Sequence, residues 1–257
     1  EAGVPCIDLF GVPLDEDKDD TGSVAWDPQG ILNRGISCLH EEFGDDLIVM
    51  ADTCLDEFTS HGHCGVLDDK GRVLNDESVK LYQDMARSQA RAGAQIVSPS
   101  GMMDGQVAAI RADLDEAGHE DVAIMAYSAK YASAFFGPFR DAVGSSLEGD
   151  RRTYQQDPRN FRESLLEAEL DIEEGADFVM VKPGLPYLDV LSAVAETSPV
   201  PVAVYQVSGE YAMVKAAAAN GWIDGEAIML ESLTAFKRAG AGQILTYFAT
   251  EAARLLK

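Results

Sequence analysis

Short apolar runs alternate with longer amphipathic stretches along almost the whole chain, and this alternation constrains the fold more than any other feature. The runs are rich in valine, isoleucine and methionine and lack strict alternation with polar residues, which is typical of strands buried on both faces of a parallel sheet. They are Val4–Phe10, Leu47–Ala51, Ile96–Ser98, Val122–Ala126, Phe178–Val181, Val202–Val207 and Ile244–Phe248. Repeated strand–helix units predict right-handed crossovers, and therefore either an open doubly wound sheet or a closed barrel.

The stretches between these runs carry helical signals. Helices are predicted where apolar residues recur at helical spacing, in Ser78–Ala92, Phe161–Glu174 and Leu188–Thr197. Glycines just before three of the strands are expected to end helices; they are Gly93, Gly175 and Gly240. Two further stretches, Val12–Trp26 and Phe136–Gln155, are predicted to be long loops after strands, and loops of that length often serve as lids.

Two features favour a barrel over an open sheet. Neither a GxGxxG fingerprint nor a phosphate-binding loop follows any run. Polar residues instead stand at or just past the predicted strand ends: Asp52, Ser100, Ser128–Lys130, Lys182, Ser208–Glu210 and Tyr247. Because α/β barrels keep their active sites at this edge, we predict one TIM-type (β/α)8 domain over residues 1–257. Seven runs leave it one strand short, so we expect the first strand to precede residue 1.

The charge of the chain narrows the classes of partner. Forty-four acidic residues against 20 basic ones give a net charge of −24, which disfavours binding to nucleic acid or to an anionic membrane. The apolar runs are all shorter than the ~18 residues of a spanning helix. Four cysteines without a disulfide-framework spacing fit a reducing compartment, so we expect a cytoplasmic protein. The acidic excess indicates either adaptation to a salt-rich cytoplasm or a highly soluble surface.

Two lysines are candidates for covalent chemistry. Lys182 directly follows the apolar run Phe178–Val181, and Lys130 stands at a similar depth on another strand. Partial burial lowers the pKa of an ammonium group, and two lysines on one rim depress each other further. A neutral amine can attack a ketone and form a Schiff base. The alternative is that each lysine extends its charged end to the surface beside a carboxylate.

A loop after the second run concentrates metal-ligand residue types. It carries Cys54, Asp56, His61, His63 and Cys64, and thiolate, carboxylate and imidazole groups at short spacing suit zinc. The alternative is a pair of small buried cysteines beside a polar loop.

Basic residues are scarce in this chain, yet Arg140, Arg151 and Arg152 all fall within the predicted loop Phe136–Gln155. Such arginines can grip a substrate carboxylate through parallel hydrogen bonds. Ion pairing with the many local acids is the alternative.

Together, these motifs resemble those of the porphobilinogen synthase (delta-aminolevulinic acid dehydratase) family. The resemblance rests on segments in the expected order: Met50–Gly65, Ser98–Gly105, Tyr127–Arg140, Asp150–Gln155, Val181–Gly184, Tyr205–Tyr211 and Leu245–Ala249. It implies a TIM barrel with an N-terminal arm. It also implies a lyase that condenses two molecules of 5-aminolevulinate into porphobilinogen with loss of water, an early step of tetrapyrrole and heme biosynthesis.

The resemblance also implies roles for individual residues. Lys182 would form the Schiff base with the first substrate, and Lys130 would bind the ketone of the second. Ser208 and Tyr247 would hold the first carboxylate. The second carboxylate would be held from the lid by Arg140, Arg151 and Gln155. Asp52 would transfer protons near the reacting amine.

The metal loop and the N-terminus depart from the family's pattern. Zinc-type members carry three cysteines in this loop, whereas this chain carries the mixed set Cys54, Asp56 and Cys64. We expect Zn²⁺ there, bound more weakly than by three thiolates, with His63 as a substitute ligand. A regulatory Mg²⁺ at Glu167 is a further expectation. The family forms octamers with the help of its arm, so we expect a homo-oligomer whose size is open for this chain.

Two other functions compete with this interpretation. One is a different class I Schiff-base aldolase on the same fold, although such an enzyme needs only one lysine and does not explain Arg140 and Arg151. The other is an inactive, truncated barrel that binds metal or partner subunits without turnover.

Overall fold

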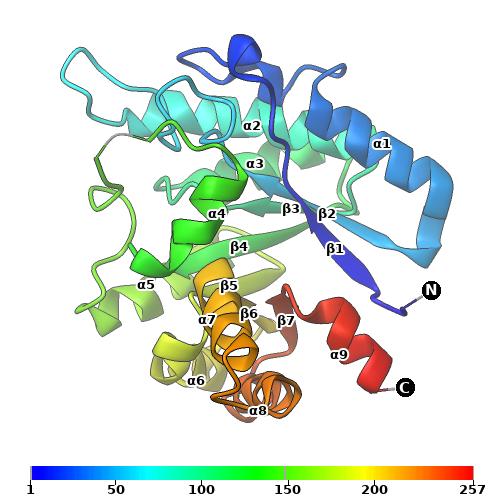
Figure 1. Cartoon of the computed structure of the whole chain (residues 1–257). Helices are drawn as coiled ribbons and strands as arrows, with labels where there is room; N and C mark the ends of the chain where they lie inside the picture. The colour runs from blue at the N-terminus through cyan, green and yellow to red at the C-terminus, as the bar shows by residue number, and fades with distance from the viewer. Residues whose placement is uncertain (1, 148, 257) are drawn as a thin grey trace.

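The computed structural model describes residues 2–147 and 149–256 and shows parallel strands surrounded by helices (Figure 1). Within these residues the strands form one seven-stranded sheet, and each strand pairs in parallel with the next one along the chain. The strands are β1 (Cys6–Leu9), β2 (Ile48–Thr53), β3 (Ile96–Pro99), β4 (Ala123–Lys130), β5 (Phe178–Lys182), β6 (Val202–Gln206) and β7 (Gln243–Thr246). Spatial order that follows chain order is the wall of a barrel, and the TIM-type prediction is confirmed.

Helices connect the strands and cover the outside of the sheet (Figure 1). They are α1 (Ile31–Phe43), α2 (Asn75–Ala92), α3 (Gln106–Glu116), α4 (Gly137–Ala142), α5 (Phe161–Glu173), α6 (Leu188–Thr197), α7 (Ser208–Ala219), α8 (Gly225–Arg238) and α9 (Ala249–Leu255). Short 3-10 turns lie at Asp15–Asp17, Ser23–Ala25, Gly44–Asp46, Ala134–Phe136 and Leu185–Tyr187. The three predicted helices are confirmed as α2, α5 and α6.

The predicted helix ends are also confirmed. Gly93, Gly175 and Gly240 have φ angles of +107°, +103° and +107°. This left-handed conformation ends a helix and carries little strain only in glycine.

Alternation along the strands separates two apolar layers. On β2, Val49 and Ala51 face the helices, whereas Met50 faces the barrel interior. The interior layer consists of Met50, Met125, Tyr127, Phe136, Met180, Ala203, Tyr205 and Val207. The barrel interior next to the carboxyl ends of the strands is therefore apolar.

The structure corrects two boundaries. The run Val122–Ala126 is only the first part of β4, which continues to Lys130 through a register shift between Ala126 and Ala129. This shift places Lys130 directly opposite Lys182. The stretch Phe136–Gln155 is not wholly irregular, because it contains α4. At the other end of the sheet, β7 ends at Thr246, so Tyr247 lies just past it.

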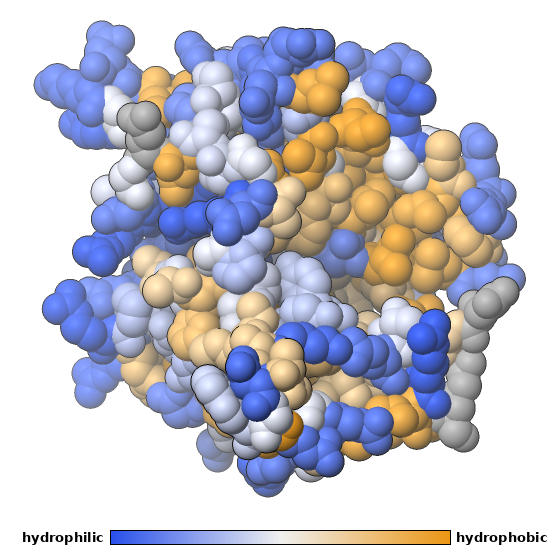
Figure 2. All heavy atoms as spheres, viewed as in Figure 1, coloured by the Kyte–Doolittle hydropathy of each residue, from blue (hydrophilic) through white to orange (hydrophobic). Residues whose placement is uncertain are grey.

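Hydrophobic residues gather on the face crossed by β1, between α1 and α9, and charged residues surround them (Figure 2). Phe43 and Ile48 are among the exposed large apolar side chains. The described strands pair from β1 through to β7, with no pairing among them that joins β7 to β1.

Candidate active site

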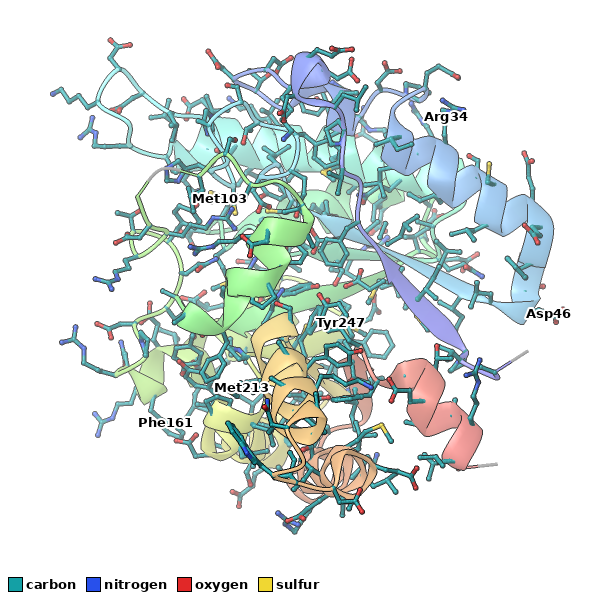
Figure 3. All side chains as sticks on the ribbon, viewed as in Figure 1. Arg34, Asp46, Met103, Phe161, Met213 and Tyr247 are labelled. Carbon is teal, nitrogen blue, oxygen red and sulfur yellow. The ribbon has the colours of Figure 1, made fainter. Side chains whose placement is uncertain are left out.

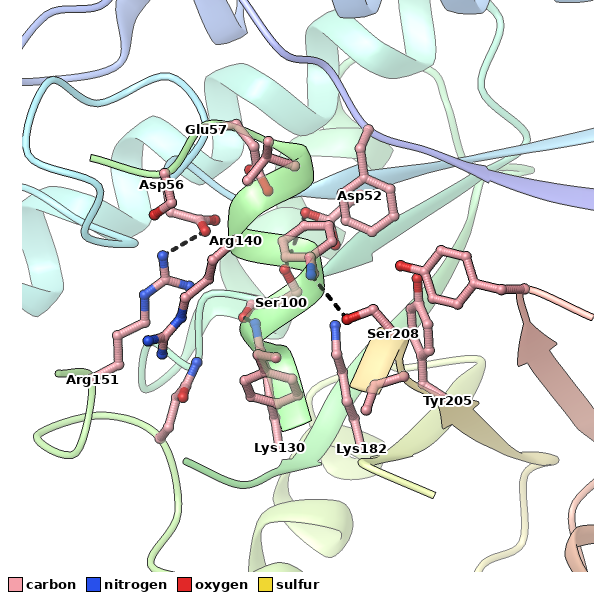
Figure 4. Close-up of a pocket in the computed structure, with 18 residues that line it drawn as sticks. Asp52, Asp56, Glu57, Ser100, Lys130, Arg140, Arg151, Lys182, Tyr205 and Ser208 are labelled. Carbon is pink, nitrogen blue, oxygen red and sulfur yellow. Dashed lines mark hydrogen bonds and ion pairs between the residues drawn. The ribbon is translucent and has the colours of Figure 1, made fainter. Parts of the chain in front are cut away.

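One pocket at the carboxyl ends of the strands collects the predicted substrate-binding and catalytic residues (Figure 4). Those that line it are Asp52, Lys130, Arg140, Arg151, Gln155, Lys182, Ser208 and Tyr247. The metal-loop residue Asp56 lines it as well. Because parallel strands end at one edge, residues far apart in the chain, such as Asp52 and Tyr247, meet there.

Lys182 occupies the aromatic side of this pocket. Its side chain is buried at the end of β5, and its Nζ lies 4.3 Å from the ring centre of Tyr205 and 4.9 Å from that of Tyr127. Phe136 and Phe139 lie slightly farther away. Burial, and then repulsion from Lys130, lower the pKa of Lys182 to about 8. A useful fraction of this lysine is therefore the neutral nucleophile near neutral pH.

Lys130 lies beside Lys182, and Figure 4 shows the two side chains rising into the pocket together. Its Nζ donates a hydrogen bond to the Ser100 carbonyl oxygen. Burial opposes its charge, but the acidic groups of the metal loop, Cys64 and Cys54 foremost, outweigh burial and raise the pKa of Lys130. Lys130 is therefore a permanent cation at neutral pH.

Asp52 interacts electrostatically with both lysines and with Asp56 of the metal loop. It is 4% exposed at the end of β2, and Ser100 Oγ donates to its Oδ2 across 3.2 Å. Its Oδ1 is buried and has no hydrogen-bond partner among the described residues. Burial raises the pKa of Asp52 to about 6, although Lys130 and Lys182 oppose this rise. A carboxyl group with this pKa can both accept and donate a proton near neutral pH.

The metal loop brings Cys54, Asp56 and Cys64 together, and all three are buried. One ligand atom from each lies within 4.8 Å of the others, so a single ion can contact all three. Burial opposes the thiolate of Cys64, but a hydrogen bond from Cys54 and the charge of Arg151 lower its pKa. The tight packing has a local cause, because the Tyr82 hydroxyl donates to the Cys64 carbonyl oxygen.

Other candidate ligands lie elsewhere. His63 contacts the Tyr154 hydroxyl through Nδ1, and the described residues do not place it in the three-residue group. Glu167 is half-buried on α5, and burial together with neighbouring acids, Glu163 first, raises its pKa. That acidic surface fits a cation less closely than the buried group does.

Arg151 already has a partner in this structure. Its Nη2 donates to Asp56 Oδ2 across 2.7 Å and to the Gly62 carbonyl oxygen across 2.8 Å, and both members of the ion pair are buried. Arg151 therefore links the segment Phe136–Gln155 to the metal loop, and its role in binding a carboxylate stays a prediction. A substrate carboxylate would share this guanidinium with Asp56.

The opposite wall of the pocket is the start of α7. Ser208 begins this helix, and its Oγ accepts a hydrogen bond from the Phe139 N–H of α4. Gly209 permits the close approach, because a Cβ there would lie 2.4 Å from the Phe135 carbonyl oxygen. Tyr247 is 44% exposed beside this helix (Figure 3), with its ring 5.7 Å from that of Tyr211. A helix N-terminus flanked by two hydroxyls suits a carboxylate.

The sequence did not reveal the roles of several residues in or around the pocket. Tyr127, Phe136 and Tyr205 lie in or near apolar runs, where aromatic residues are expected to belong to the hydrophobic core. Glu210 is almost fully buried and accepts hydrogen bonds from the backbone of Val207, Gly184 and Leu185. It thereby ties the loop after Lys182 to α7, a role that its place among the polar strand-end residues Ser208–Glu210 did not reveal.

Comparison with known proteins agrees with this geometry. A relative from Streptomyces coelicolor, named delta-aminolevulinic acid dehydratase, is 64% identical over all of this chain and 78% of its own length. A Mycobacterium tuberculosis protein of the same name is 64% identical over 98% of this chain and 77% of its own. The solved structure of the Toxoplasma gondii dehydratase, in complex with the reaction product porphobilinogen, superposes with a TM-score of 0.97. It is 49% identical and covers 99% of this chain and 73% of that one.

The family model described as delta-aminolevulinic acid dehydratase matches residues 1–255. With its strand-end lysines and metal loop in one pocket, this chain belongs to the delta-aminolevulinic acid dehydratase family.

Proposed function

We propose that the protein condenses two molecules of 5-aminolevulinate into porphobilinogen with loss of water, as a lyase of heme biosynthesis. The observation that carries this proposal is the register pairing of Lys130 with Lys182, within a chain that belongs to the dehydratase family. The family assignment favours this reaction over the aldolase alternative. The inactive-barrel alternative is decided by assay.

Lys182 is the proposed nucleophile for the first substrate. Its neutral amine attacks the ketone carbon, and the ketone oxygen leaves as water with one proton from the amine and one from a pocket acid. Asp52 is the candidate acid. The product is a protonated Schiff base, which withdraws electrons from the neighbouring carbon and makes its C–H bond acidic. Ser208, Tyr247 and the start of α7 hold the carboxylate of this substrate.

The second substrate is proposed to occupy the charged side of the pocket. Lys130 donates to its ketone oxygen and stabilises the negative charge that develops there. Arg140, Arg151 and Gln155 hold its carboxylate from the lid segment. Fixing two small flexible acids in one orientation removes much of the entropic barrier to their joining. The packing of α4 over the lysines keeps water out of a reaction that releases it.

Zn²⁺ is the proposed occupant of Cys54, Asp56 and Cys64. Two thiols and one carboxylate suit zinc better than magnesium, which prefers oxygen ligands. Because Arg151 contacts Asp56 through Oδ2, the other carboxylate oxygen is left for an ion. When bound, zinc would supply a Lewis acid beside the second substrate. The test is metal content after dialysis against zinc or magnesium. Cobalt substitution adds a second readout, since a thiolate-to-cobalt absorption band should appear and be lost in Cys64→Ser.

Assembly and location complete the proposal. Family resemblance supports a homo-oligomer, up to the family's octamer, and native mass spectrometry would give its size. Within the described residues, no helix combines the length and apolar character that a membrane span requires. We propose a cytoplasmic location, which fractionation of the source cells would test.

Borohydride trapping with 5-aminolevulinate, followed by peptide mass spectrometry, tests the central step. Borohydride reduces a Schiff base to a stable amine, so the expected adduct lies on Lys182. The Lys182→Met variant should lose it, whereas Lys80→Met, which removes an exposed lysine of α2, should keep it. Folded protein that forms neither adduct nor porphobilinogen would favour the inactive barrel.

A further inference from the structure

Asp8 is an acidic residue on the inner wall of the barrel. It lies on β1 between Cys6 and Phe10, and both of these side chains pack against the interior apolar layer. Alternation along the strand gives Asp8 the same inward direction. A carboxyl group in an apolar layer weakens the fold unless its hydrogen bonds are satisfied.

The hydrogen bonds of Asp8 are only half satisfied. The Tyr127 hydroxyl donates to its Oδ2 across 3.0 Å, whereas Oδ1 is buried and has no partner among the described residues. Burial, reinforced by the charge of Asp52, raises the pKa of Asp8 to about 8, although Tyr127 and Lys182 oppose this rise. Stability of the fold therefore does not account for an acid at this position.

Tyr127 links Asp8 to the proposed nucleophile. This tyrosine is fully buried, and its ring centre lies 4.9 Å from Lys182 Nζ. The titratable groups that face Asp8 come from every neighbouring element: Cys6, Asp52, Tyr127, Lys182, Tyr205 and Tyr247. Lys182 is the cation among them.

We propose that Asp8 is a positioning residue for Lys182, which holds the Tyr127 ring against the lysine and becomes the counter-ion of its protonated Schiff base. The proposal rests on the proposed function of Lys182. Schiff-base formation joins Nζ to the ketone carbon, expels the ketone oxygen as water and takes up one proton overall. A neutral Asp8 that ionises beside the new cation releases one proton. The charge of the pocket then changes little during this step.

Two variants separate the charge of Asp8 from its shape. Asp8→Asn can still accept the bond from Tyr127 but carries no charge, whereas Tyr127→Phe removes the bond and leaves the charge. Asp46→Asn removes one exposed carboxylate and serves as the matched control. The measurement is the rate and the extent of borohydride-trapped adduct on Lys182 between pH 6 and 9.5, with 5-aminolevulinate as the probe.

Near pH 8 Asp8 is ionised in part of the molecules. Because a negative charge raises the pKa of a nearby ammonium, loss of Asp8 lowers the pKa of Lys182. The acid limb of the trapping rate should therefore move to lower pH in Asp8→Asn, by about half a unit to one unit. The extent of adduct above pH 8 should fall about three- to tenfold, because the protonated Schiff base loses its counter-ion. Asp46→Asn should match the wild type. Tyr127→Phe should change the amount of adduct, but it should move the acid limb of the trapping rate less than Asp8→Asn does.

Thermal melting separates a merely structural role from this one. Because the pKa of Asp8 is raised in the fold, the wild type loses stability relative to Asp8→Asn as pH rises from about 4 to 8. A structural role would change melting alone. An unmoved limb and unchanged extent in Asp8→Asn, beside normal trapping in the wild type, would overturn this inference only. Absence of adduct in the wild type would overturn the role of Lys182 and this inference together.

Discussion

Lys182 and Lys130 are the same residue type in directly opposite register positions, yet their two sides of the pocket treat them differently. On the aromatic side of the pocket, burial and then repulsion from Lys130 lower the pKa of Lys182 to about 8. The acidic groups of the metal loop raise that of Lys130. One lysine is thereby prepared to attack and the other to remain a cation. The difference shows that the neighbours across the barrel, and not the strand end itself, assign the chemistry.

The largest effects are expected when each lysine is exchanged for methionine, because this removes the difference between the two sides. Lys182→Met should lose the trapped adduct and lower kcat/KM by more than about 10⁴-fold, because it removes the nucleophile. Lys130→Met should keep an adduct on Lys182 while losing about 10²–10³-fold in kcat, because it removes one charge-stabilising donor. Borohydride trapping measures the adduct, and steady-state assays measure the loss of activity. Loss of the adduct in Lys130→Met with retention in Lys182→Met would reverse the assignment.

The buried ion pair on the charged side of the pocket should contribute more to the stability of the fold than an exposed ion pair does. Arg151→Met leaves Asp56 as an unpaired buried carboxylate and should cost about 3–5 kcal/mol of unfolding free energy at neutral pH. Arg159→Met is the control, because the Arg159–Asp157 pair is exposed and should contribute little to the free energy of unfolding. Urea unfolding with a chelator present measures both. Equal costs would mean that the buried pair is not structurally distinct.

The pH dependence of the two sides should be coupled. The rate of Schiff-base formation in the wild type should rise with pH and level off above about 8, as Lys182 loses its proton. Lys130 repels the Lys182 proton, so Lys130→Met should raise the pKa of Lys182 and move this limb to higher pH by about half a unit. This direction is opposite to that expected for Asp8→Asn. A limb that stays in place would argue against contact between the charges.

The smallest expected effect is that of salt, which should act on the outer surface and hardly on the pocket. A net charge of −24 repels itself at low ionic strength, so Tm should rise by a few degrees between about 0.1 and 2 M KCl. The acid limb of the trapping rate should hardly move, since buried charges are screened much less. Differential scanning calorimetry at several KCl concentrations provides the check. A Tm that is highest at low salt would rule out salt adaptation of this surface.

Much of the architecture could be predicted because it depends on local patterns. The runs rich in valine and isoleucine marked the strands, and Gly93, Gly175 and Gly240 marked helix ends. The pocket membership of Lys130, Lys182 and Asp52 followed from their places after apolar runs, because parallel strands end at one edge. Zinc at the metal loop and the individual roles of these residues remain proposals.

Other features could not be predicted because they depend on contacts across the barrel. Asp8 lies inside the apolar run Val4–Phe10 and drew no functional prediction. Tyr205 lies in another apolar run, where an aromatic residue is expected to be part of the core. The bulge in β4 left no mark in the residue pattern. The ion pair between Arg151 and Asp56 joins positions 95 residues apart, so spacing gives no sign of it.

The sequence by itself thus determined the order of strands and helices, the edge at which the polar residues meet and the family to which they point. These follow from hydrophobic periodicity and from motifs that are local in the chain. The tertiary structure alone decided which lysine has the lowered pKa, which acid contacts the tyrosine beside it and which carboxylate Arg151 holds. Protonation depends on distance and on exclusion of water, and both are set by residues that are remote in sequence and adjacent in space.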